Sequence, residues 1–232
     1  MSWPTAPFKI AVTDGDRPRG RLRFGSHHGL GQTCGSPAMT LLATRWLRRS
    51  AAVVLAVLAL ASCARESLVG TDLGGQAAPD FTLVDGARGD RVTLSALRGS
   101  VVLLTFLYTQ CPDSCPLTAE KIRQAAEALG SHASAISFLA VSVDPAHDTP
   151  EAIRDFLAAH ALTGRLRYLI ADAASLSAVW RNYSVGVGRA DPGVVHLDAI
   201  MLVDRAGRAR ILLHSDVEVA ALAQDLRLLA SE

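Results

Sequence analysis

Apolar runs and helix-forming segments alternate along residues 79–232. The run VVLLTFLY at 101–108 is apolar without alternation, which is typical of a strand covered on both faces of a sheet. Two further strands are predicted by ISFLAVSVD at 136–144, which also reads as buried, and by RLRYLIAD at 165–172. A segment that predicts a helix follows each of them, at 117–130, 150–162 and 175–183. The pattern therefore predicts strands and helices in alternation.

Local signals mark where the predicted helices begin. Thr149 stands before Pro150, a pair that predicts an N-cap followed by the first helical residue. Pro116 predicts in the same way the first position of the helix after 101–108. The sequence SDVE at 215–218 has the pattern of a capping box, which predicts that a C-terminal helix begins there.

Antiparallel pairs are expected at both ends of this region. Residues 78–100 predict two short strands around a Gly-rich turn, with a brief helical turn after them. Residues 196–204 and 208–215 predict two further strands, joined by a hairpin turn at 204–207. The whole order predicts an α/β protein with a central mixed sheet flanked by helices and an N-terminal β-hairpin extension. It resembles the thioredoxin-like fold.

The N-terminal part of the chain has a different character. Residues 1–38 are rich in Gly, Pro and Arg and follow no helical or strand period, which indicates a disordered extension or a start assigned upstream of Met39. A short functional arm is the alternative. Residues 39–62 combine arginines, a short apolar segment and small residues, which is typical of an export signal peptide. The apolar segment is shorter than the roughly 20 residues of a membrane-spanning helix.

Residues 60–63, LASC, resemble a bacterial lipobox. That resemblance implies a lipid on Cys63, a mature chain that begins there, and a membrane-anchored protein facing the periplasm or the cell exterior. A cleaved signal with an incidental cysteine, or an uncleaved anchor, is the alternative. Residues 63–78 then form a polar linker before the domain at 79–232.

Charge and cysteine content narrow the function. The formal net charge of +1 gives no electrostatic reason to expect a nucleic-acid partner. Of the four cysteines, Cys111 and Cys115 lie four residues apart, between a predicted strand and a predicted helix. A structural disulfide, a metal site and a redox pair all remain open. The helix N-terminus favours a thiolate at Cys115, and a disulfide closing so small a loop adds little stability.

Three blocks resemble the signature blocks of the Sco/SenC family: FLYTQCPDSCPLT, FLAVSVDPAHDTPEAIRDF and VVHLDAIMLVDRAG. The resemblance implies a membrane-tethered, thioredoxin-fold copper protein linked to the assembly of cytochrome c oxidase. It also implies that Cys111, Cys115 and His196 bind copper, whereas Asp144 and Asp148 brace a loop. Two soft thiolates and an imidazole suit Cu(I) and Cu(II). Without the resemblance, His196 is better explained as a surface or strand-end residue. Asp198 is a candidate to orient its imidazole.

Three functions compete on these grounds. The first is a copper chaperone that delivers copper to a cytochrome c oxidase subunit or another extracytoplasmic cuproprotein. The second is a thiol–disulfide reductase acting on cuproprotein cysteines, in which Cys111 and Cys115 are the redox pair. Against it, residues 196–203 lack the proline that thioredoxin-like reductases place before the strand facing their cysteines. The third is a lipoprotein scaffold with an inert disulfide.

Overall fold

A computed structural model describes residues 67–189, 194–196 and 198–232, and of residues 189 and 194–196 only the backbone. The extension at 1–38, the signal peptide at 39–62 and the lipidation site Cys63 lie outside this part of the chain. Within it, no helix is long and apolar enough to span a bilayer.

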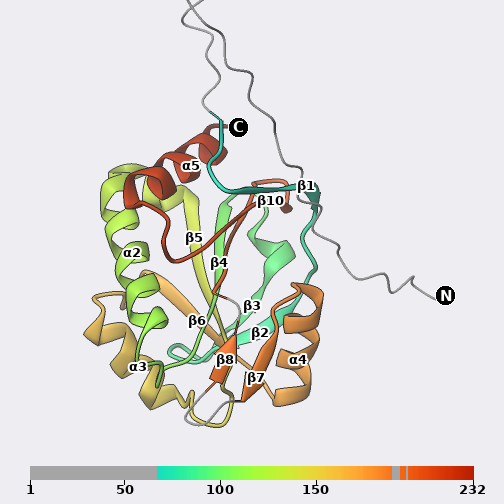
Figure 1. Ribbon diagram of the computed structural model, residues 1–232, viewed down its shortest axis with the longest axis vertical. Coiled ribbons are helices and arrows are strands. Elements are labelled where there is room, and N and C mark those ends of the chain that lie inside the picture. Colours follow the sequence, from blue (N-terminus) through green and yellow to red (C-terminus); the bar gives the residue numbers. More distant parts are fainter. Residues whose placement is uncertain (1–66, 190–193, 197) are drawn as a thin grey trace, which may run out of the picture. The chain divides into compact units, whose positions relative to one another are not determined.

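The described residues form a mixed sheet whose strands lie in the order β1-β10-β9-β4-β5-β6-β2-β3 (Figure 1). The strands are β1 (Thr71–Ala77), β2 (Thr82–Asp85), β3 (Arg91–Thr93), β4 (Val101–Leu107), β5 (Ile136–Ser142), β6 (Leu166–Ile170), β9 (Ile200–Val203) and β10 (Arg208–Leu213). β4, β5 and β6 run parallel, and β9 lies antiparallel to β4. A separate hairpin joins β7 (Val187–Arg189) to β8 (Val194–His196).

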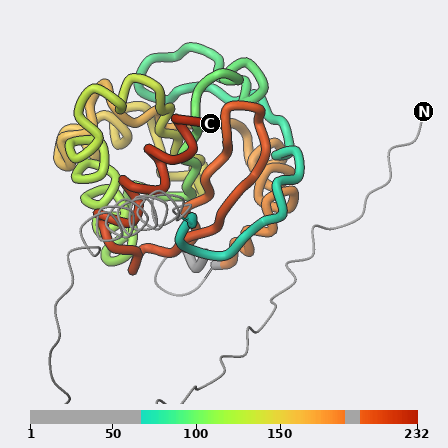
Figure 2. Tube along the Cα trace, turned by 90° about the horizontal axis from the view of Figure 1, so that it is seen from above, coloured from blue at the N-terminus to red at the C-terminus, as the bar shows by residue number. Residues whose placement is uncertain are grey.

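Helices cover both faces of the sheet. They are α2 (Ser114–Leu129), α3 (Pro150–Ala159), α4 (Ala173–Asn182) and α5 (Val219–Ser231), with 3-10 turns at Leu94–Leu97 and Gly130–Ala135. In both views α2, α3 and α5 lie on one side of the sheet and α4 lies on the other (Figures 1 and 2). The two parallel crossovers through α2 and α3 step across the sheet in the same direction, which places both helices on one face.

The core follows from the apolar runs. Every residue of β4 is buried, as expected for a strand with helices on both sides. The helical segments turn their apolar faces to the sheet, with Ile122 and Leu129 of α2 buried. The alternation of strands and helices from β4 to α4, the hairpin at 78–100 and the thioredoxin-like fold class are therefore confirmed. The β7–β8 hairpin was not predicted, and β9 covers only Ile200–Val203 of the strand predicted at 196–204, because His196 belongs to β8.

Other local predictions also differ from the structure. Residues 71–77, assigned to the linker, form β1 and pair with β10, because the exposed edge of β10 offers backbone partners to a segment with little strand character of its own. α2 begins at Ser114, so Pro116 is its third residue and not its first. Proline is tolerated there as well, because the N–H groups of the first helical turn have no intrahelical carbonyl to bind.

The capping-box prediction at 215–218 was wrong. α5 begins at Val219 without a side-chain cap, and the preceding residues form a turn closed by the Val217 N–H on the His214 carbonyl. The backbone N–H of Ser215 donates to the Asp198 carboxylate over 3.0 Å, which holds this turn against the segment before β9. The N-cap of α3 is confirmed, since Thr149 Oγ1 accepts from the Ala152 N–H over 3.2 Å.

Candidate metal centre

The cysteine pair lies where β4 ends and α2 begins. Cys115 is the second residue of α2 and is fully buried, and Cys111 lies in the preceding loop and is 8 % exposed. No disulfide bond joins the two sulfurs. The Cys111 sulfur accepts the Cys115 backbone N–H over 3.3 Å, and the Ser114 hydroxyl lies 3.8 Å from the same sulfur. The helix N-terminus is therefore directed at Cys111.

This geometry corrects the expected assignment of the thiolate. The hydrogen bond from the Cys115 thiol lowers the pKa of Cys111 to about 4, against the opposing effect of burial, and backbone N–H groups add to the stabilisation. The same hydrogen bond, together with burial, raises the pKa of Cys115 far above its usual value. Cys115 was expected to be the thiolate because it was placed at the helix start. In the structure its backbone N–H, rather than its sulfur, carries the effect of the helix dipole.

Asp148 braces the loop that leads to the cysteines. Its Oδ1 accepts the backbone N–H and the hydroxyl of Thr109, each over 2.8 Å. Its Oδ2 accepts the Ser142 hydroxyl over 2.5 Å and the Tyr168 hydroxyl over 3.1 Å. The expected bracing role of Asp148 is confirmed, whereas nothing in the sequence singled out Thr109 or Tyr168 as its partners.

The backbone of His196 reaches the same end of the sheet. Thr105 near the end of β4 pairs with Ile200 at the start of β9, and its hydroxyl donates to the Ala199 carbonyl over 2.8 Å. Cys111 follows Thr105 by six residues, and His196 precedes Ile200 by four. Figure 1 shows the β7–β8 hairpin at the end of the sheet where α2 begins. The His196 side chain lies outside the described atoms, so its role as a ligand stays a prediction.

The remaining polar candidates have local partners. The Asp198 carboxylate holds Ser215, and its expected role beside His196 stays a prediction. His147 pairs with Asp144 through a 2.6 Å contact between Nδ1 and Oδ2, and His214 Nδ1 lies 2.6 Å from the Asp198 carbonyl. Trp180 donates from Nε1 to the Ser142 carbonyl over 3.0 Å, which makes it a packing residue at this end of the sheet.

Among the described side chains, no three His, Cys, Asp or Glu residues come together as a metal site. The two cysteines supply two sulfur donors, one of them already disposed to ionise, and a third donor has to come from outside this set of side chains. A soft ion with low coordination number fits two such sulfurs better than a closed four-ligand zinc site does.

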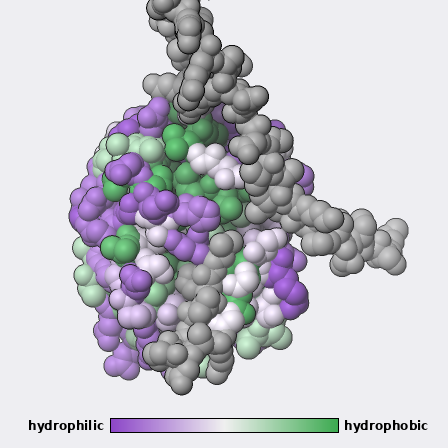
Figure 3. Space-filling view, viewed as in Figure 1, coloured by the Kyte–Doolittle hydropathy of each residue, from purple (hydrophilic) through white to green (hydrophobic). Residues whose placement is uncertain are grey.

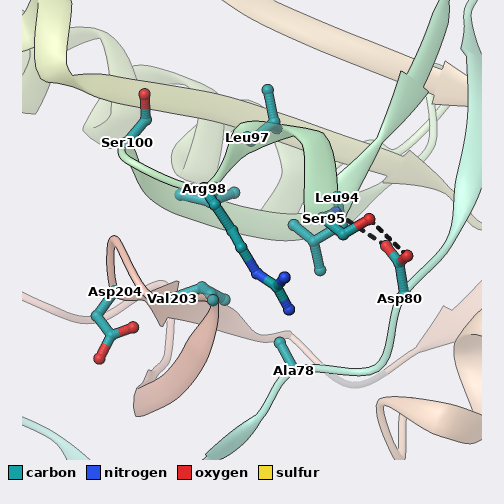
Figure 4. A pocket seen from close by; sticks show the side chains of 11 residues that line it. Ala78, Asp80, Leu94, Ser95, Leu97, Arg98, Ser100, Val203 and Asp204 are labelled. Atoms are coloured by element: carbon teal, nitrogen blue, oxygen red, sulfur yellow. Dashed lines mark hydrogen bonds between the residues drawn. The ribbon is translucent and has the colours of Figure 1, made fainter.

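The other end of β4 holds a small pocket. It has a volume of about 70 Å³ and lies between Ala78, the Leu94–Leu97 turn and the end of β9. Figure 4 shows the Arg98 side chain extending into it, with the Asp80 carboxylate bonded to Ser95 on one side and Asp204 on the other. The charged pocket and the sulfur site therefore lie at opposite ends of the sheet.

The face of the molecule around α2 and α3 is mostly hydrophilic (Figure 3).

Comparisons with known proteins agree with this arrangement. Residues 70–231 match the model of the SCO1/SenC family. The chain is 35% identical over 78 residues to an SCO2-like protein of Rickettsia conorii, a match that spans 34% of this chain and 38% of that protein. The aligned region thus spans under half the length of this curated relative.

Two solved structures share the fold over nearly their whole length. Copper-bound ScoI of Bradyrhizobium japonicum is 30% identical with a TM-score of 0.59, and the match covers 66% of this chain and 99% of that one. The apo Sco1 protein of Thermus thermophilus is 29% identical with a TM-score of 0.61, and the match covers 73% and 99%. Together with the family match, these similarities lead to one conclusion: the chain belongs to the SCO1/SenC family.

Proposed function

We propose that this protein is a copper chaperone that holds copper through Cys111, Cys115 and His196 and passes it to an extracytoplasmic cuproprotein. The observation that carries the proposal is the pair of cysteines at the start of α2, which no disulfide joins, with the Cys111 sulfur facing the helix N-terminus. The client that the family resemblance implies is a cytochrome c oxidase subunit.

The chemistry of the donors supports copper. Thiolates are soft ligands that prefer Cu(I), and Cys111 is held in a setting that favours its thiolate form. An imidazole from His196 would complete a site able to hold Cu(II) as well. ScoI of Bradyrhizobium japonicum, similar to this chain at 30% identity, has been solved with copper bound.

The unequal burial of the sulfurs supports transfer by stepwise ligand exchange. Cys111 is 8 % exposed and Cys115 is fully buried, so an incoming ligand from the client meets Cys111 first. Cys115 would then retain the ion until the client supplies its second ligand. The buried thiol therefore limits loss of copper to solvent during the exchange.

A lipid anchor at Cys63 would place this activity at a membrane surface. The support is the LASC lipobox and the export signal before it. Mass spectrometry of the purified mature N-terminus tests this part of the proposal: a diacylglycerol adduct on Cys63 is expected, and an unmodified or uncleaved N-terminus contradicts it.

The second candidate is a thiol–disulfide reductase. One observation favours it: a thiolate that is less deeply buried than the thiol beside it is the arrangement of an attacking and a resolving cysteine. The two functions separate by their need for metal, since rapid reduction of a disulfide substrate by the metal-free protein supports the reductase.

A copper titration tests the chaperone. The reduced full chain, with Cys34 and Cys63 replaced by Ser so that only the pair remains, is titrated with Cu(II) and followed by sulfur-to-copper charge-transfer absorption. One equivalent is expected to saturate the band, and Cys115→Ser is expected to lower the affinity more than about a hundredfold, because oxygen is a poor ligand for this soft site. Unchanged affinity in Cys115→Ser would contradict the proposal. Ser114→Ala, which changes a hydroxyl beside the Cys111 sulfur, is the matched control.

A further inference from the structure

Asp148 is buried, and every hydrogen bond that its carboxylate accepts comes from one of three parallel strands or from the segment directly after one of them. Thr109 follows β4, Ser142 ends β5 and Tyr168 lies in β6. The carboxylate is 3 % exposed, and its two oxygens accept four hydrogen bonds, which uses the full acceptor capacity of the group. One side chain thus ties the segment before Cys111 to the two neighbouring strands.

The consequence for the cysteines follows from the position of Thr109. It is two residues before Cys111, and both its backbone N–H and its hydroxyl end on Asp148 Oδ1. The Cys111 backbone N–H donates to the Tyr108 carbonyl over 3.3 Å, which makes the connection a tight turn. A displacement of Thr109 would therefore be passed to the Cys111 sulfur, which has to stay 3.3 Å from the Cys115 N–H.

We propose that Asp148 is a positioning residue of the thiol site: by fixing Thr109 it holds the Cys111 sulfur against the start of α2 and so stabilises the reduced pair. The proposal rests on the cysteine pair being the working site of the proposed function. It assigns to Asp148 no contact with metal, client or either sulfur. Its effect is predicted for the metal-free protein, so it can fail or hold independently of copper binding.

Two substitutions separate position from charge. Asp148→Asn keeps an oxygen that can accept from Thr109, and its amide can donate to the Ser142 and Tyr168 hydroxyls, so the bracing survives without the negative charge. Asp148→Ala removes every one of these bonds. If Asp148 acts by position, the asparagine variant behaves like the wild type and the alanine variant does not.

The control is a carboxylate of the same kind at the other end of β4. Asp204 is also 3 % exposed and accepts the backbone N–H groups of Ala206 and Arg208 in the turn after β9. It lies at the pocket shown in Figure 4. Asp204→Ala should loosen a turn and lower stability, as Asp148→Ala does, without touching the loop that carries Cys111.

The test is the thiol–disulfide equilibrium of the full chain with Cys34 and Cys63 replaced by Ser, in glutathione buffers without metal. In this exchange the protein dithiol and one glutathione disulfide give the protein disulfide and two glutathione thiols. Asp148→Ala is expected to shift the equilibrium constant towards the protein disulfide by about tenfold, whereas Asp148→Asn and Asp204→Ala stay within about threefold of the wild type.

Two results would overturn the proposal. One is an equilibrium constant in folded Asp148→Ala within about twofold of the wild type. The other is an equal shift in Asp148→Asn, which would assign the effect to charge. Circular dichroism establishes folding of each variant. If Asp148→Ala does not fold, Thr109→Val removes only the hydroxyl bond to Asp148 and is expected to shift the constant about threefold; no shift in that variant would equally overturn it.

Discussion

Asp148 and Asp204 are buried carboxylates at opposite ends of β4, and the protein accommodates them differently. Asp204 accepts from the Arg208 side chain over 2.9 Å and lies 3.3 Å from Arg210. Asp148 accepts hydrogen bonds from hydroxyls and a backbone N–H, and it takes part in none of the ion pairs found among the described residues. The first carboxylate has cationic partners and the second has neutral ones.

The difference shows in their pKa values. Burial raises the pKa of Asp148 above its usual range, and its hydrogen bonds oppose this only in part. Burial acts on Asp204 in the same direction, but the hydrogen bonds from Arg208 and Arg210 outweigh it and lower the pKa. The end of the sheet that carries the turn is thus charge-compensated, whereas the end that carries the cysteines leaves a carboxylate without a cation.

The largest effect is expected in the reactivity of the cysteines. Because the pKa of Cys111 is about 4, its alkylation by iodoacetamide should stay nearly constant from about pH 8 down to about pH 5. Cys115→Ala removes the hydrogen bond from the thiol, raises this pKa and should slow alkylation of Cys111 at about pH 6 by tenfold or more. Mass spectrometry of the labelled peptides measures both, in the chain with Cys34 and Cys63 replaced by Ser.

Asp204→Ala is the control for this labelling, and its profile should match that of the wild type. Labelling of Cys115 in preference to Cys111 would contradict the assignment of the thiolate, and with it the contrast between the two ends.

A smaller effect, on the order of 1–2 kcal/mol, is expected in the pH dependence of stability, with opposite signs at the two ends. The raised pKa of Asp148 stabilises the fold below its unfolded pKa of about 3.9, and this contribution is lost as pH rises through the folded pKa. The free energy of unfolding of Asp148→Asn should therefore increase relative to that of the wild type as pH rises from about 4 to about 7.

For Asp204 the lowered pKa stabilises the fold above about pH 3.9 and the contribution is lost as pH falls through the folded value. Asp204→Asn should therefore be less stable than the wild type at neutral pH, and the deficit should shrink on acidification. Urea unfolding followed by circular dichroism over this range measures both differences. If the stability relative to the wild type changed with pH in the same direction in both variants, the two carboxylates would not differ in the way described.

The smallest effect is expected from the helix cap beside Asp148. Thr149→Ala loses the 3.2 Å hydrogen bond to the Ala152 N–H, so the free energy of unfolding should fall by about 1 kcal/mol. The thiol–disulfide equilibrium should stay within about twofold of the wild type, because Thr149 caps α3 and does not hold Thr109. A shift as large as that of Asp148→Ala would mean that any loosening of the segment around Asp148 and Thr149 changes the thiol–disulfide equilibrium, and not the loss of the bonds to Thr109 in particular.

The sequence predicted the parts of this site that depend on local patterns. The apolar runs placed β4 and β5, Thr149 marked the start of α3, and the spacing of Cys111 and Cys115 placed both beside a helix start. It missed β1, because TDLGGQA is polar and Gly-rich and forms a strand only by pairing with β10.

The thiolate assignment and the network of Asp148 required three-dimensional information. Which sulfur meets the helix N-terminus depends on α2 beginning at Ser114 and not at Pro116, a shift that the sequence pattern does not reveal. Tyr168 and Asp148 lie 20 residues apart and meet only because β5 and β6 pair in parallel. The placement of the His196 imidazole depends in the same way on how the segment before β9 is packed.

The proposed function requires that Cys111, Cys115 and His196 surround one copper ion. X-ray absorption at the copper edge, recorded on the reduced full chain with Cys34 and Cys63 replaced by Ser and loaded with one equivalent of Cu(I), tests it most directly. We expect two sulfurs and one imidazole nitrogen around the copper, with the imidazole signal lost in His196→Ala. An imidazole signal that persists in His196→Ala, or a shell with fewer than two sulfurs, would contradict it.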